Sequence, residues 1–283
     1  MLRDLLTTSR PLSWINTAYP FAAAYWMVTR EIDAALIVGA LFFLIPYNVA
    51  MYGINDVFDY ASDLANPRKG GAEGAVLQPR MHRVTLVAAA VLCLPLAAVL
   101  VTFGSWPSWI ALGISLFAVV AYSAPGLRFK ERPFLDSITS STHFVSPAVY
   151  GLLLAGAEWS VALYALLAAF FLWGMASHAF GAVQDVVPDR AGGIGSIATV
   201  LGAAWTVRFA LAAWLAAGLL MLLTGWPGAL AALFVIPYLA LAAPFASVSD
   251  EDSGAANRGW RRFLGANYLV GFLVTMLLIA VAW

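Results

Sequence analysis

The chain has few charged residues and almost no cysteine, and these shortages exclude several classes of protein. Only 11% of its 283 residues are Asp, Glu, Lys or Arg, whereas 62% are hydrophobic and the mean hydropathy is +0.84. Such a composition excludes an ordinary soluble domain. Cys93 is the one cysteine, so a disulfide within the chain is excluded, and its apolar neighbours indicate a buried thiol. The N-terminus also lacks the pattern of a signal peptide, so we expect the spans themselves to direct insertion.

Nine apolar runs predict an all-α, polytopic membrane protein whose single domain covers residues 1–283. A membrane-spanning helix needs roughly 20 apolar residues, and runs near that length recur along the whole chain. They lie near 12–29, 34–55, 84–103, 107–124, 137–156, 160–183, 203–223, 229–247 and 264–282. Pro11 and Pro20 interrupt the first of them.

The basic residues gather on one side of this predicted bundle. Of the 15 Lys and Arg residues, all but Arg30 lie at the N-terminus or in or near the long loops, which cover about 56–83, 125–136, 184–202 and 248–263. Cytoplasmic loops carry the excess of Lys and Arg. We therefore expect an N-terminus and long loops in the cytoplasm of a bacterial-type cell, with the C-terminus outside. Lys and Arg balance Asp and Glu in number, and we expect no nucleic-acid partner.

An acidic cluster follows the second apolar run. It reads Asn55-Asp56-Val57-Phe58-Asp59-Tyr60-Ala61-Ser62-Asp63. If the helix continues through it, Asn55, Asp59 and Asp63 share one face, where like charges repel one another. Carboxylates kept together beside lipid point to a cation that neutralises them. Mg2+ takes one or two carboxylates and completes its shell with water and phosphate oxygens. The cluster therefore predicts a diphosphate site at a membrane boundary.

A second acidic cluster follows the sixth run, four helices later. Asp185 and Asp189 are again four residues apart, which suits two pseudo-repeated four-helix halves plus one further helix. Pro188 argues against a continuous helix, so we expect Asp185 to close the sixth helix and Asp189 to lie on a turn. Glycines 192, 193 and 195 then suit a loop that a ligand can approach closely.

With these two motifs, and with Tyr122-Ser123, Arg128 and Lys130 after the fourth run, the sequence resembles the UbiA superfamily of intramembrane prenyltransferases. The resemblance implies a nine-helix bundle around a central cavity, in which both acidic motifs hold Mg2+ against an allylic diphosphate. It implies one metal site with Asn55, Asp56, Asp59 and Asp63, and another with Asp185 and Asp189. The implied diphosphate ligands are Tyr122, Arg128 and Lys130, and Arg68 and Lys69 are candidates to close over the phosphates.

Three further strings resemble the lycopene elongases of C50 carotenoid synthesis within that superfamily. They are Ser9-Arg10-Pro11-Leu12-Ser13-Trp14-Ile15-Asn16, Asp63-Leu64-Ala65-Asn66-Pro67-Arg68-Lys69-Gly70-Gly71, and Glu131-Arg132-Pro133-Phe134-Leu135-Asp136-Ser137. This resemblance implies transfer of a C5 unit from dimethylallyl diphosphate to a terminal double bond of lycopene, once at each end.

Transfer to an alkene leaves a tertiary cation that loses a proton or takes up water. Diphosphate, His143, His178 or a carboxylate can accept the proton, and the residues do not choose among them. Asn16 can contact substrate or bridge helices, and Phe58, Tyr60 and Tyr150 can shield a cation with their rings.

Less specific interpretations stand beside these. Each histidine can be an ordinary core residue, and Arg128 and Lys130 can be positive-inside anchors. The run Asp250-Glu251-Asp252 has no apolar spacing and suggests a solvated loop.

Two other functions compete with the alkene prenyltransferase. One is a prenyltransferase for an aromatic acceptor of quinone or chlorophyll-precursor type, although no group for recognising such a ring stands out. The other is a cation transporter, because acids within membranes also mark ion pathways. A transporter is expected to carry its acids near the bilayer midplane, whereas these lie at helix ends beside basic residues.

Overall fold

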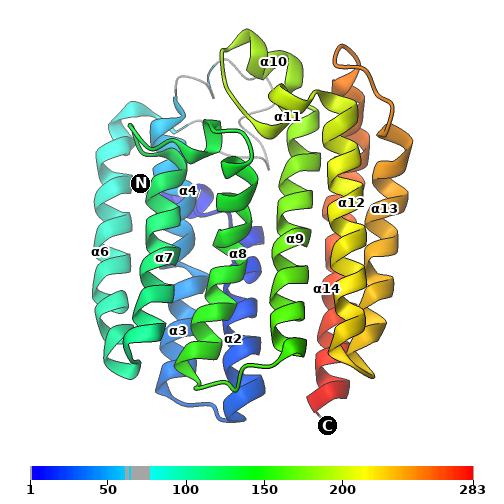
Figure 1. Cartoon of the computed structure of the whole chain (residues 1–283). Coiled ribbons are helices and arrows are strands. Elements are labelled where there is room, and N and C mark those ends of the chain that lie inside the picture. The colour runs from blue at the N-terminus through cyan, green and yellow to red at the C-terminus, as the bar shows by residue number, and fades with distance from the viewer. Residues whose placement is uncertain (1, 61–63, 65–76, 283) are drawn as a thin grey trace. The chain divides into compact units, whose positions relative to one another are not determined.

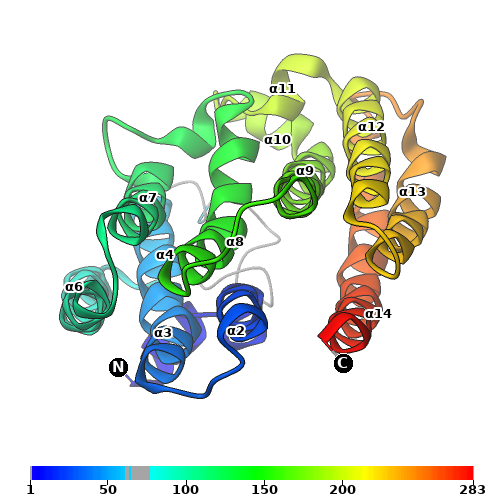
Figure 2. The same ribbon diagram turned by 60° about the horizontal axis from the view of Figure 1, so that its bottom comes forward.

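The computed structural model describes residues 2–60, 64 and 77–282, and every regular element among them is a helix. The chain divides into two compact units, residues 1–129 with 142–157 and residues 130–141 with 158–283. Figure 1 shows the long helices of each unit, and Figure 2 shows them from one end.

Unit 1 contains the helices up to the middle of α8. They are α1 (Leu2–Thr8), α2 (Ile15–Thr29), α3 (Ala34–Leu44), α4 (Pro46–Phe58), α6 (Pro79–Phe103), α7 (Trp106–Ser123) and the larger part of α8 (Leu135–Leu154). Helix α4 packs beside α6 and contacts α7. Unit 1 therefore carries the first acidic motif.

Unit 2 contains the start of α8 and all later helices. They are α9 (Val161–Val183), α10 (Val186–Ala191), α11 (Ile197–Leu201), α12 (Ala203–Met221), α13 (Ile236–Ala242) and α14 (Asn257–Ala282), with a 3-10 stretch, Gly228–Val235, before α13. Helices α9 and α12 lie side by side, and α10 and α11 follow the end of α9. Unit 2 therefore carries the second acidic motif.

Seven helical stretches among the described residues are long and apolar enough to cross a membrane. They are Ala34–Phe58, Pro79–Phe103, Trp106–Ser123, Val161–Val183, Ala203–Thr224, Gly228–Phe245 and Ser253–Ala282. The protein is therefore an all-α integral membrane protein. Nine spans were predicted, and the other two predicted helices are α2, which has only 15 residues, and α8, which is rich in Ser and Thr.

The second predicted helix is broken where the sequence analysis expected a continuous one. Pro46 has no N–H group and begins α4 directly after Ile45, so carbonyl groups of α3 lose helical donors. The side-chain amide of Asn48 donates to the carbonyls of Phe43 and Leu44 at 2.8 and 3.0 Å. Thr17 of α2 also donates to the Phe43 carbonyl at 2.7 Å. The carbonyl groups left free by the break are thus hydrogen-bonded inside the protein, and the break sets the direction of α4.

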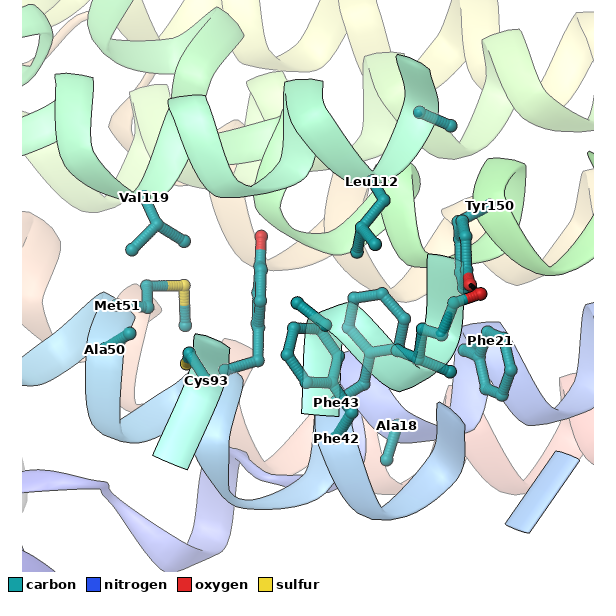
Figure 3. Packing of buried hydrophobic residues seen from close by; sticks show 14 of the residues in the cluster. Ala18, Phe21, Phe42, Phe43, Ala50, Met51, Cys93, Leu112, Val119 and Tyr150 are labelled. Carbon is teal, nitrogen blue, oxygen red and sulfur yellow. Dashed lines mark hydrogen bonds between the residues drawn. The ribbon is translucent and has the colours of Figure 1, made fainter. Parts of the chain in front are cut away.

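Aromatic rings fill the core of unit 1 (Figure 3). The Phe21 ring contacts Phe43 and Tyr150, with centroids 5.3 and 5.8 Å away, and those two rings are 5.9 Å apart. Phe42 meets Phe43 edge to face. Gly39 makes this possible, because a Cβ atom there would lie 2.1 Å from the Phe21 ring. Tyr150 is fully buried and its hydroxyl donates to the Leu100 carbonyl, so it is a core residue in this structure.

A second aromatic core and many small residues hold unit 2 together. Trp214 stacks on Tyr238 at 5.5 Å, and Trp260 stacks on Phe263 at 4.9 Å. Buried Ala and Gly residues let α9 and α12 approach closely, which favours helix packing where lipid removes most of the hydrophobic driving force. They are Ala165, Ala169, Gly174, Ala176, Ala179, Ala203, Ala210, Ala213, Ala217 and Gly218.

Candidate functional site

The first acidic motif lies at the end of α4. The helix ends at Phe58 and Asp59 caps it, so the continuous helix expected through Asp63 does not extend past Phe58. Asp56 and Asp59 are 1% and 4% exposed, which is costly for carboxylates unless a positive charge lies close to each. Asp63, Arg68 and Lys69 lie outside the described residues.

Arg10 balances Asp56, and sequence reasoning missed this role. Its guanidinium donates to an Asp56 carboxylate oxygen at 3.0 Å and lies 4.2 Å from the centre of the Tyr52 ring. Arg10 has a φ of 51°, a left-handed conformation that is unusual for arginine. Arg10 belongs to the string from Ser9 to Asn16 that resembles the lycopene elongases. This resemblance is the one sequence signal that could have indicated its role.

Arg128, the predicted diphosphate ligand, lies beside Asp59 in unit 1. Its guanidinium is 3.8 Å from the Asp59 carboxylate and donates to the Phe58 carbonyl at 3.4 Å. Its φ of 40° is again left-handed, a strain found most often at functional positions. Asn55 is held from α7, because the Ser123 hydroxyl donates to its side-chain oxygen at 2.9 Å. Unit 1 therefore brings together both carboxylates, the amide and Arg128.

Tyr122 and His143 contact each other within unit 1. The two rings meet edge to face at 5.3 Å, and His143 is 3% exposed. Asn16 is exposed on α2, and its neighbour Thr17 makes the buried contact between helices by accepting from Asn48 at 2.8 Å.

The second acidic motif forms a short helix of its own in unit 2. Helix α9 ends at Val183, and Asp185 stands directly before α10. Asp189 lies within α10, not on the turn that was predicted, because Pro188 falls in the first turn of that helix, where a missing N–H costs nothing. Gln184 fixes the junction by accepting a hydrogen bond from Asn257 at the start of α14.

The loop after α10 runs close to the protein's own backbone. A Cβ atom on Gly195 would lie 2.6 Å from the Glu131 carbonyl oxygen, and Gly193 has a φ of 68°. The sequence predicted that a ligand approaches closely at glycines 192, 193 and 195. In the structure, the group that lies close to Gly195 is the backbone of residue 131. Lys130, the other predicted basic ligand, lies one residue earlier in a 3-10 turn and is half-buried.

Asp250 ties the second motif to α12, although the sequence suggested only a solvated loop there. One carboxylate oxygen accepts from the Ala203 N–H at 2.6 Å, and the other accepts from Arg190 at 2.5 Å. Arg190 also donates twice to the Thr199 carbonyl. The Ala203 N–H and Arg190 hold the pKa of Asp250 below its ordinary value. Asp250 thus links α10, α11 and the first turn of α12.

Asp250→Asn tests this link through its pH dependence. A lowered pKa in the folded state stabilises the protein above the unfolded pKa of about 3.9, and this contribution disappears as the pH falls through the folded value. At pH 7 we expect the variant to be less stable by about 1 kcal/mol, which is typical of a partly exposed charge pair. Thermal unfolding in detergent should show the gap closing below about pH 4. A gap that stays constant with pH would contradict the role given to the charge.

A buried pair of polar side chains joins three helices of unit 2. Asp136 at the start of α8 is fully buried, and its oxygens accept from the N–H groups of Ser137 and Ile197, both at 2.7 Å. His178 of α9 places Nε2 3.7 Å from the same carboxylate. The sequence left His178 either as an ordinary core residue or as a proton acceptor, and it did not indicate this partner.

The residues of the first motif fit Mg2+ by their chemistry. Within residues 2–60, 64 and 77–282, no three His, Cys, Asp or Glu side chains form a group that could hold a metal ion. Mg2+ bound to a diphosphate, however, needs only one or two carboxylates from the protein, because phosphate oxygens and water complete its octahedron. The buried Asp56 and Asp59 are hard oxygen donors at one end of a helix, and Arg128 adds the positive charge that suits a phosphate.

The apolar helices define an integral membrane protein that carries two acidic motifs at helix ends. The model of the UbiA prenyltransferase family matches residues 17–268, and the chain belongs to this family.

Two curated relatives are similar over nearly the whole chain. The C(50) beta-cyclic carotenoids biosynthesis protein LbtBC of Dietzia sp. (strain CQ4) is 54% identical over 99% of this chain, which spans 65% of the length of that protein. The lycopene elongase/hydratase of Corynebacterium glutamicum is 50% identical over 99% of this chain and 98% of its own length.

A solved structure has the same fold. It is a UbiA homolog from Archaeoglobus fulgidus bound to DMAPP and Mg2+, with a TM-score of 0.68, and the match covers 94% of this chain and 98% of that one. At 19% identity this likeness concerns the fold alone.

Proposed function

We propose that this chain is a Mg2+-dependent prenyltransferase that transfers a dimethylallyl unit from dimethylallyl diphosphate to a terminal double bond of lycopene, in the synthesis of C50 carotenoids. The observation that carries the proposal is the 50% identity to a lycopene elongase/hydratase over 99% of this chain and 98% of that protein. The buried carboxylates of α4, each beside an arginine, supply the chemistry that this reaction requires.

The proposal includes the finer membrane arrangement. Helices α2 and α8 complete nine spans, and the N-terminus and the loops that carry the acidic motifs face the cytoplasm. The distribution of Lys and Arg supports this orientation, because all of them except Arg30 lie at the N-terminus or in or near the four long loops on that side.

The roles of the residues follow from the charge that grows in the reaction. Breaking the carbon–oxygen bond leaves an allylic cation and a diphosphate anion, so the leaving group must be stabilised and water must be kept away. Mg2+, when bound by the two acidic motifs, acts as a Lewis acid on the diphosphate. Arg128 and Lys130 bind its oxygens, and Tyr122 orients it. Arg10 balances the charge of the Asp56 carboxylate in its buried position.

The alkene acceptor needs no deprotonation before it attacks. The double bond of lycopene is itself the nucleophile, so the site needs an apolar chamber more than a strong base at this step. Membership of a prenyltransferase family argues against cation transport. An aromatic acceptor remains the competing substrate, and the same assay separates it from lycopene by which product carries the label.

The assay is direct. Purified protein is given labelled dimethylallyl diphosphate and lycopene with Mg2+, and C45 and C50 products are measured as alkenes and as alcohols, because the Corynebacterium protein is named both elongase and hydratase. We expect both chain lengths, and none after Mg2+ is chelated. If a quinone precursor is labelled and lycopene is not, the acceptor is aromatic and the lycopene proposal is wrong. If neither is labelled, the proposed prenyltransferase activity is wrong.

Arg128→Gln separates a diphosphate ligand from a positive-inside anchor. A charge-assisted hydrogen bond contributes about 1.5–3 kcal/mol, so we expect the Kd for Mg2+–dimethylallyl diphosphate to rise about 10- to 100-fold. Arg83→Gln removes an exposed arginine from the start of α6 and is the matched control, with an unchanged Kd. If the two variants bind Mg2+–dimethylallyl diphosphate with the same Kd, Arg128 is a positive-inside anchor and not a diphosphate ligand.

A further inference from the structure

A structural role explains only half of the pair formed by Asp136 and His178. Asp136 is sealed from solvent, while the His178 side chain is 20% exposed. Asp136 accepts hydrogen bonds from two backbone N–H groups, and it thereby caps the start of α11 and the first turn of α8. These hydrogen bonds explain why a carboxylate is tolerated there. They do not explain why an imidazole faces it from an apolar helix.

The histidine is unusual for its position. Helix α9 contains no other ionisable group over Val161–Val183 apart from Tyr164. An ionisable residue in a membrane-spanning helix marks a functional site by default. A carboxylate beside Nε2 favours the tautomer that carries its proton on Nε2, which leaves the lone pair on Nδ1.

The spacing along α9 relates this histidine to the second acidic motif. His178 lies five residues before Val183, the last residue of α9, and is therefore about 7.5 Å along the axis from the helix end that Asp185 follows. A diphosphate held at Asp185 would place the reacting carbons beyond that end, toward the depth of His178.

We propose that His178 is the proton acceptor of the prenyl transfer and that Asp136 is the residue that positions it; this inference rests on the proposed function. After the alkene attacks, the product is a tertiary cation. In the first outcome, a C–H bond next to the cation breaks, its electron pair forms the new alkene, and the proton goes to Nδ1. In the second, a water oxygen bonds to the cation and the water's proton goes to Nδ1. In both outcomes a neutral product and an imidazolium next to the Asp136 carboxylate result.

The test compares elongated carotenoid formed with diphosphate released. In the wild type we expect one diphosphate for each C5 unit added. In His178→Gln we expect elongated product to fall at least about 100-fold, the usual contribution of a positioned acid or base. Diphosphate release and the affinity for Mg2+–dimethylallyl diphosphate should persist, because the acidic motifs are intact. His82→Gln, on α6, is the matched control and should keep the wild-type ratio.

Asp136→Asn tests the positioning role separately. It keeps the size of the side chain and an oxygen for one of the two backbone N–H groups. We expect kcat to fall about tenfold or more with KM unchanged, and the ratio of product to diphosphate to fall with it. His178→Asn serves if the glutamine variant does not fold. Product and diphosphate falling together, or neither changing, would overturn the inference. If the wild type itself makes no elongated carotenoid, the proposed function fails instead.

Discussion

Asp59→Asn is expected to lower prenyl transfer at least about 1,000-fold, which corresponds to about 4 kcal/mol of lost transition-state stabilisation. The side chain is 4% exposed at the end of α4, and asparagine has the same size, so the helix end should keep its shape. What is lost is the charge that would hold Mg2+ beside Arg128. The measurements are turnover with lycopene and the affinity for Mg2+–dimethylallyl diphosphate.

The control for this variant removes an exposed charge from the same unit. Glu31→Gln lies in the short turn between α2 and α3 and should leave both quantities unchanged. Folding is checked by the unfolding temperature in detergent. Turnover of Asp59→Asn within about threefold of the wild type would show that the first motif does not bind the metal.

Asp185→Asn should produce a loss of the same size from unit 2. The residue stands between α9 and α10, where Gln184 and Asn257 hold the chain independently of its charge. Because the diphosphate is expected to bind Mg2+ from both motifs, removing one carboxylate should disable the site. Glu251→Gln, on an exposed loop of the same unit, is the control. Full activity of Asp185→Asn would limit the metal site to α4.

The double variant asks whether the two motifs act as one site. Residues that act as a unit show losses that do not add, so Asp59→Asn combined with Asp185→Asn should be hardly less active than either alone. If the motifs were two independent sites, the fold losses of activity in the two single variants would multiply in the double variant.

The helices were predictable because long apolar runs between charged turns have few alternatives in a membrane. The break before Pro46 was missed because its cost depends on Asn48 and Thr17, whose contacts with the Phe43 carbonyl appear only in three dimensions. Asp189 was misplaced because a proline that interrupts one helix can begin the next.

Within the site, residue types were predictable and partners were not. The carboxylates of α4 and Arg128 carry their chemistry in their side chains, and the structure places them together in unit 1. The partners Arg10 and Asp56 are 46 residues apart, and Asp136 and Ile197 are 61 apart. Hydropathy and spacing report neighbours along a helix, not contacts between distant segments. Arg10 and Asp136 nevertheless lie within the strings that drew attention for their resemblance.

The most direct measurement is an experimental structure with Mn2+ in place of Mg2+ and a dimethylallyl diphosphate analogue that cannot ionise. The anomalous signal of Mn2+ locates each metal ion independently of the protein. We expect metal ions at bonding distance from Asp59 and from Asp185, about 2.0–2.3 Å, all bound to one diphosphate. Metal at one motif only, or a separate ligand at each, would contradict the shared site on which the proposed reaction depends.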